Sequence, residues 1–256
     1  SDYDSAGGFL TLTSGNGVTL QDLSANNTAT IDLGAGALTI TGAATLADNA
    51  AITATGGISF SSTIDADNAS SNDRTLSMNS GTGSTIAVTG NVGASQALSG
   101  LTITQSNGAT FSGSVDVSDS SSGTITITDT EDGSDITFSG AVTLETVSFA
   151  QTGYDLVFNG GGTFTNAATF QNTGNLNLGD ASGDAFTFNG GLTESTSGTV
   201  TLAGSIDSSN DVMTFGAVTL AAATTLDSNA TNTTGDITIG TVTGSNNNLT
   251  LDTTTT

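Results

Sequence analysis

The stretch Asp135-Ile136-Thr137-Phe138-Ser139-Gly140-Ala141-Val142-Thr143-Leu144 decides the fold of this 256-residue chain. Apolar and polar side chains alternate on both sides of Gly140, which predicts two short β-strands joined by a bend. The same pattern, apolar-x-apolar-x-Gly-x-apolar-x-apolar, recurs around Gly42, Gly113 and Gly160. A unit that repeats along a chain indicates a repeat architecture.

The spacing of this unit predicts a solenoid. Weaker copies are centred on Ser62, Gly90, Gly190, Gly216 and Gly240. All copies together recur at a mean step of about 25 residues, which suits one turn of a parallel β-helix. We therefore expect an all-β fold, a right-handed parallel β-helix (β-solenoid) of roughly ten coils. Residues 1–256 would form a single repeat domain, a piece of a longer repetitive protein.

Composition also favours a thin, extended core over a deep globular one. Hydrophobic residues make up 35% of the chain and aromatic residues only 5%. We expect Phe138 and Phe158 to stack one coil apart inside the solenoid, and essentially no helix to form. Disorder is disfavoured, because the chain has no Pro and its apolar residues follow period two. An antiparallel sandwich or barrel array is the main alternative, since short strands with frequent turns suit it too.

The charge balance excludes several classes of partner. One Lys or Arg faces 24 Asp and Glu, so the net charge is −23, and Arg74 is the only basic side chain. Binding to nucleic acid or to anionic headgroups depends on Lys and Arg that neutralise phosphate, so we expect neither. No stretch approaches the roughly 18 apolar residues that a transmembrane helix needs.

The missing residue types also argue against catalysis. The chain has no His and no Cys, which removes the commonest general base, the thiol nucleophile and the usual zinc ligands. Lyases built on parallel β-helices need basic residues, and Arg74 alone does not supply them. A glycosidase with two Asp is conceivable, but no pair stands out. We expect no enzyme and assign no catalytic residue.

Calcium is the ligand that the acidic turns fit best. Hard cations choose carboxylate and carbonyl oxygens, and the densest acidic loop contains Asp129, Glu131, Asp132 and Asp135. The loop matches neither an EF-hand nor the nonapeptide of calcium-binding β-rolls. Solvated acidic turns are therefore the favoured interpretation, with calcium at this loop as the alternative.

Rows of threonine form a second candidate surface. Pairs such as Thr39/Thr41 and Thr102/Thr104 resemble the flat faces with which some β-solenoids bind ice. The rows do not recur at constant spacing in the sequence. Threonine is also a natural outward residue of a β-strand, so a solvated face is the favoured interpretation.

The repeats resemble the β-solenoid regions of large bacterial surface proteins, the filamentous-haemagglutinin-like adhesins and autotransporter passenger domains. The resemblance rests on stretches such as Ala37-Leu38-Thr39-Ile40-Thr41-Gly42 and residues 135–144, and it covers nearly the whole chain. It implies export, a secreted or cell-surface location, and scaffolding or adhesive work.

Three functions follow as expectations. The first is a non-catalytic extracellular structural protein, a stiff solenoid that builds a surface fibre, sheath or layer. The second is an adhesin that binds a glycan or another cell through one face, and the least favoured is a polysaccharide-degrading enzyme. Solenoid ends expose strand edges that pair with other chains unless they are capped, and residues 1–8 and 253–256 look like poor caps. We therefore expect continuation into more repeats, or self-association end to end or side by side.

Overall fold

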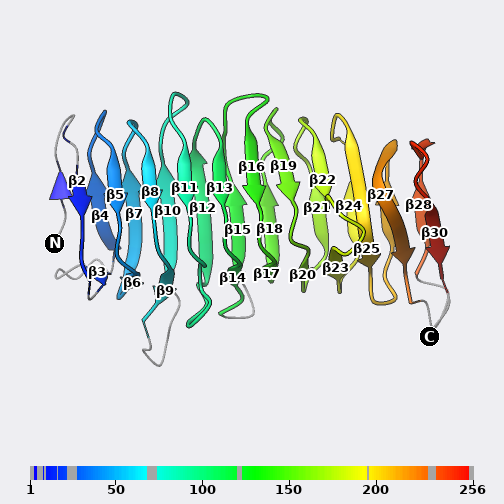
Figure 1. Ribbon diagram of the computed structural model, residues 1–256, viewed down its shortest axis with the longest axis horizontal. Helices are drawn as coiled ribbons and strands as arrows, with labels where there is room; N and C mark the ends of the chain where they lie inside the picture. The colour runs from blue at the N-terminus through cyan, green and yellow to red at the C-terminus, as the bar shows by residue number, and fades with distance from the viewer. Residues whose placement is uncertain are drawn as a thin grey trace.

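The computed structural model describes residues 3–4, 8, 10–15, 17–21, 28–67, 74–119, 123–194, 196–229 and 235–253. Every regular element in these ranges is a β-strand. The strands form a parallel β-solenoid of about nine turns, with about 24 residues per turn. Figure 1 shows the coils side by side along the long axis, from the blue N-terminal end to the red C-terminal end. None of the described residues belongs to a helix that could span a membrane.

Each coil contributes strands to three faces, numbered here in the order in which the chain reaches them. The first face holds β1 (Tyr3–Asp4), β4 (Thr28–Asp32), β7 (Asn49–Thr53), β10 (Thr75–Asn79), β12 (Gly100–Gln105), β15 (Thr124–Ile127) and β18 (Thr146–Phe149). Next to β18, the same face continues with β21 (Ala168–Phe170), β24 (Leu192–Glu194), β26 (Met213–Phe215) and β28 (Ile237–Ile239).

The second face has the longest run of paired strands. It holds β2 (Leu10–Leu12), β5 (Leu38–Ile40), β8 (Ile58–Phe60), β11 (Ile86–Val88), β13 (Ala109–Phe111), β16 (Asp135–Phe138), β19 (Asp155–Phe158), β22 (Leu176–Leu178) and β29 (Val242–Thr243). Two long strands, β25 (Val200–Asp207) and β27 (Val218–Asp227), pair on this face with their first residues and on the third face with their last.

The third face completes each coil. It holds β3 (Val18–Leu20), β6 (Ala44–Leu46), β9 (Ile64–Ala66), β14 (Val115–Val117), β17 (Val142–Leu144), β20 (Gly162–Phe164), β23 (Ala185–Phe188) and β30 (Leu249–Asp252). Single bridges at Val92 join β9 to β14.

The pairing confirms the predicted parallel architecture. Every strand pair in the described part of the chain is parallel, which excludes the antiparallel sandwich. Ile86 pairs with Ala109, Ala109 with Ile136, and Ile136 with Leu156, although these steps cover 23, 27 and 20 residues. Loops between the faces therefore absorb the differences in coil length, and the strands stay in register.

The core is a thin column of inward side chains, as the composition predicts. Most three-residue strands bury their first and last residues and turn the middle one outward. Phe111, Phe138 and Phe158 stack on the second face with ring centroids 5.1 and 5.0 Å apart and nearly parallel planes. The predicted ladder of Phe138 and Phe158 is confirmed. Each such pair contributes about 0.5–1.5 kcal/mol beyond the burial of its area.

Glycine lines the corner between the second and third faces because successive backbones touch there. A Cβ atom built on Gly140 would lie 2.5 Å from the carbonyl carbon of Gly113, and one on Gly160 would lie 2.4 Å from that of Gly140. Real Cβ atoms do not approach backbone so closely. None of these three glycines has a positive φ. The repeat therefore needs glycine for close approach between coils, and not for a left-handed backbone.

Three members of the predicted glycine series belong to other corners, which is a correction. A Cβ on Gly190 would meet the backbone of Ala167, between the third and first faces. A Cβ on Gly240 would meet that of Gly216, between the first and second faces. The predicted period of about 25 residues was thus an average over glycines from all three corners. It lies close to the observed turn of about 24 residues because each corner can contain a glycine bend.

The expectation of poor caps falls mainly on residues outside the described ranges. Of the predicted N-terminal segment, residues 1, 2 and 5–7 lie outside them, as do residues 254–256 at the other end.

Substitution at one corner glycine tests the stacking. We expect Gly140→Ala to lower the free energy of unfolding by about 1–3 kcal/mol, because the added methyl group overlaps the backbone of the preceding coil. Gly183→Ala is the matched control, since a Cβ there meets no atom within 4 Å. It should be neutral, or stabilise by up to about 1 kcal/mol. Equal effects of the two substitutions in urea-induced unfolding would contradict the corner geometry.

Candidate functional site

The outward positions of the second face form columns of small polar residues. Thr39, Ser59, Ala87, Thr110 and Thr137 occupy the centre of successive strands and pair in register. A second column follows two residues later, where the amides of Ser61, Thr89, Ser112 and Ser139 each bond to the preceding coil at 2.8–2.9 Å. The predicted threonine rows do not form one surface, because Thr39 belongs to β5 on the second face whereas Thr102 and Thr104 belong to β12 on the first. Along the second face, the pairing nevertheless brings residues with irregular spacing in the sequence into register.

This face is nearly uncharged although the chain carries a net charge of −23. Its strands contain two acidic residues, Asp135 and Asp155, each at the first position of its strand. The third face differs, because Asp65, Asp116 and Asp207 lie within its strands. The centre of the second face thus carries mainly Thr and Ser, interrupted by Ala87, Val157 and Asn177, with no charged side chain among them.

A groove of about 300 Å³ interrupts the second face over β11, β13 and β16. Ala87 lies in it, and the residues paired with Ala87 on the two sides are Ser59 and Thr110. Loop residues 107–108 and 133–134, with Asp135 at the start of β16, also line the groove. Because Ala87 lacks the side-chain atoms of its neighbours, the column is hollowed at this strand.

The predicted calcium ligands do not converge. Asp132 accepts a bond from the amide of Gly153 at 3.0 Å, and Asp129 accepts one from the side-chain amide of Gln105 at 3.4 Å. Glu131 is exposed on the loop, and Asp135 lies at the groove. No three acidic side chains in the described ranges gather as a metal site would require. Calcium favours six to eight oxygen ligands, so calcium at this loop would need carbonyl or water oxygens besides the carboxylates, and the site stays a prediction.

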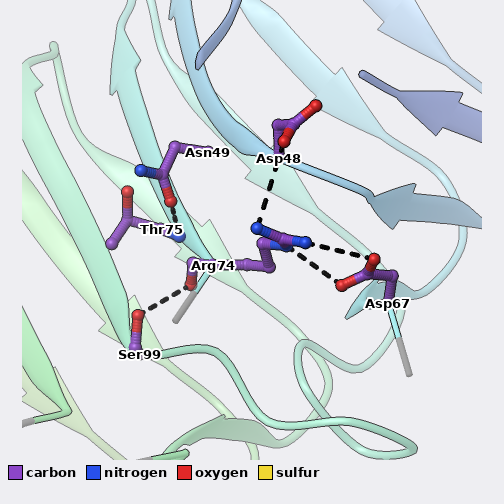
Figure 2. A network of polar contacts seen from close by, with 6 residues as sticks. All are labelled: Asp48, Asn49, Asp67, Arg74, Thr75 and Ser99. Carbon is purple, nitrogen blue, oxygen red and sulfur yellow. Dashed lines mark hydrogen bonds and ion pairs between the residues drawn. The ribbon is translucent and has the colours of Figure 1, made fainter. Parts of the chain in front are cut away.

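The only basic side chain joins three coils in the network of Figure 2. The guanidinium of Arg74 donates to both oxygens of Asp67 at 3.0 and 3.2 Å, and Asp48 lies 4.0 Å away. The carbonyl of Arg74 accepts from the amide and the hydroxyl of Ser99 in the next coil. The Arg74 side chain is 19% exposed, so this pair is partly desolvated. Such a bidentate ion pair fixes Asp67 and Arg74 relative to each other, and its geometry indicates a structural role.

Buried polar residues at the corner between the first and second faces were missed by the sequence analysis. Glu194 is 2% exposed, and its two oxygens accept from the amides of Ser197 and Gly216 at 2.7 and 3.1 Å. Asn172 donates to the carbonyls of Tyr154 and Asn175 at 3.2 and 2.9 Å. Glu194 occupies an inward position of a strand in which buried and exposed residues alternate. A charged residue at such a position was the signal in the sequence that could have indicated a buried polar site.

Tyr154 belongs to the same buried corner. Its hydroxyl donates to the carbonyl of Ala150 at 3.0 Å, and burial raises the pKa of Tyr154 above its usual range. It therefore stays a neutral donor. Glu194, Asn172 and Tyr154 thus form hydrogen bonds with backbone groups inside the coil. They belong to other coils than the groove residues of β11, β13 and β16.

The Arg74 network can be tested by salt. We expect Arg74→Met to lower the free energy of unfolding by about 1 kcal/mol in low salt, and by less in high salt, where the ion pair is screened. Arg74→Lys, which keeps the charge and loses the planar fork, should fall between the two proteins. A loss that is independent of salt would show that packing of the side-chain stem is what matters.

The calcium prediction is tested by melting. Because the four acidic side chains do not converge, we expect the same melting temperature in millimolar calcium and in EDTA. A cation that binds the folded state raises the melting temperature by mass action. A rise of several degrees in calcium that Asp132→Asn abolishes would therefore establish the site and contradict our expectation.

Comparison with known proteins adds no further assignment: no family model, no curated protein and no solved structure matches this chain. The β-solenoid fold itself agrees with the resemblance to bacterial surface proteins, and membership of any one family stays a proposal.

Proposed function

We propose that this chain is a non-catalytic structural element of an extracellular fibre, sheath or layer. One observation carries the proposal: in the described residues from Leu10 to Asp252, parallel strands stack around one core, with register shifts at Met78/Asn79 and Leu202/Gly204. At ~4.8 Å per coil, about nine turns make a rod on the order of 40 Å long. Such a rod gains length with every repeat and needs no deeper core.

Self-association, end to end or side by side, is part of this proposal. In the last described coil the side chains of Leu251 and Val242 are 56% and 38% exposed. Large apolar side chains at a strand edge are normally covered, and a further coil would cover them, whether it belongs to this polypeptide or to a second one. The extracellular location rests on the resemblance of the repeats to those of bacterial surface proteins.

Catalysis has no part in the proposal. The chain has no His, no Cys and a single basic residue, so a reaction would have to rely on carboxylates and hydroxyls alone. Most polar side chains on the strand faces are Thr and Ser. Their hydroxyl groups are weak nucleophiles unless a neighbouring base activates them.

Electron microscopy tests the structural role. We expect the purified chain to form filaments or sheets as its concentration rises, with a repeat of ~4.8 Å along the axis by fibre diffraction. Antibodies to the chain should label the outside of intact cells of the source organism. A monodisperse monomer at all concentrations, together with labelling only after the cells are permeabilised, would contradict the proposal.

An adhesive role is the second candidate, and one observation favours it. The second face keeps its centre free of charge along the strands from β2 to β29, in a chain with 24 acidic residues. A surface kept neutral amid so many carboxylates can approach a neutral partner without repulsion. A structural rod alone would not require this distribution.

A further inference from the structure

The groove on the second face is built from three successive coils. Thr85 directly precedes β11, and Ala87 lies within it. Asn107 and Thr110 belong to the β13 coil, and Asp135 begins β16. Ile86, Gly108 and Ala109 also line the groove, and the side chains of Ile86 and Ala109 are buried in the core. Because adjacent coils are ~4.8 Å apart, the groove runs for roughly 10 Å along the solenoid axis.

Two features keep the groove open. Ala87 replaces the hydroxyl residues that occupy the same column on β8 and β13. Gly133 borders the groove, and a Cβ atom built there would meet nothing within 4 Å. The hollow thus results from two absent side chains in an otherwise continuous surface. Its volume of about 300 Å³ is at the small end of the range for ligand sites.

The polar groups that line the groove are mostly neutral and point to hydroxyl chemistry. Thr85 and Thr110 are exposed and can both donate and accept hydrogen bonds. Asn107 accepts a bond from the hydroxyl of Ser134 through its amide oxygen at 2.8 Å, which leaves the amide NH₂ to donate to a ligand.

Asp135 is the one carboxylate in the groove, and it is exposed. Asp155, one coil further on, accepts two bonds from Asn175 at 2.7 and 2.8 Å. Asp135 pairs with Asp155 in the strand register and has no such partner among the described residues. A carboxylate with both oxygens accessible is a strong acceptor for hydroxyl groups.

Charge decides between the kinds of ligand. An anion would meet Asp135 and a net charge of −23 with no basic group in the groove. A cation would find one carboxylate among the lining residues, and the neighbouring Asp155 already accepts two bonds from Asn175. A neutral polyhydroxyl chain can bond to every polar group present, and it can follow the row of coils along the axis.

We propose that this groove binds a neutral oligosaccharide whose chain lies along the solenoid axis, with Asp135, Asn107 and Thr110 as its hydrogen-bond partners. The inference extends the adhesive candidate and is independent of the structural role, which stands whether or not the groove is occupied. The site is shallow and has no exposed aromatic ring, so we expect a dissociation constant on the order of 1 mM for a single site. Many copies in a fibre would bind a polymeric glycan more tightly through avidity.

The test is a titration of the ¹⁵N-labelled full chain followed by NMR. The probes are cellotetraose, xylotetraose, mannotetraose and laminaritetraose, with tetragalacturonate and tetralysine as charged comparators. We expect at least one neutral tetrasaccharide to shift the amide signals of residues 85–87, 107–110 and 133–135. Asp135→Asn should weaken that binding about tenfold or more, because a charged acceptor is lost.

A filling variant and its control make the result specific. Ala87→Leu puts a branched side chain into the hollow and should abolish the shifts, whereas Thr201→Leu makes a comparable change in the same column on β25, away from the groove. Both positions face outward on a strand, so both variants should fold. Absence of binding by all four neutral probes, equal binding by tetralysine or tetragalacturonate, or equal affinity of Ala87→Leu and Thr201→Leu would each overturn the proposal.

Discussion

The in-register parallel pairing of successive coils is the constraint on which the rest of this structure depends. Each strand lies ~4.8 Å from the next, so most strand residues have counterparts in the neighbouring coils directly above and below them. Any residue at a repeated position must therefore tolerate its own kind as a neighbour. Phenylalanine satisfies this by stacking, as Phe111, Phe138 and Phe158 do, and glycine by leaving room where the backbones meet.

The same constraint places some acidic residues directly opposite one another. Like charges directly opposite one another on paired strands destabilise a sheet, and two unit charges 4 Å apart interact by about 1 kcal/mol even in water. Asp207 and Asp227 are paired on the third face, and local donors support both. The amide of Ser209 donates to Asp207 at 2.6 Å, and Asn229 donates to both carboxylates at 2.6 and 2.8 Å. Each of these two carboxylates thus accepts a bond from a backbone amide close to it in the sequence.

The sequence predicted the features that follow from repetition, and it failed where coils must be aligned in space. The strand pattern, the parallel coil and the Phe138–Phe158 ladder all follow from local periodicity. The assignment of Gly190 and Gly216 to one corner was wrong, because a glycine bend looks the same at all three corners. The groove could not be predicted from the sequence for a related reason. Ala87 and Gly133, 46 positions apart in the sequence, line the same groove from coils that are two turns apart, and loop lengths that the sequence pattern does not reveal align those coils.

Separation of core and surface gives this fold its capacity to carry a function. Within one strand, Ile86 and Val88 face the core while Ala87 between them faces solvent. A change at Ala87 therefore alters the groove without altering the packing of the core. Since each coil contacts mainly its two neighbours, such a change stays local along the rod. A solenoid can therefore acquire a binding site at one coil while the other coils keep the rod stiff, and a structural and an adhesive role are compatible in one chain.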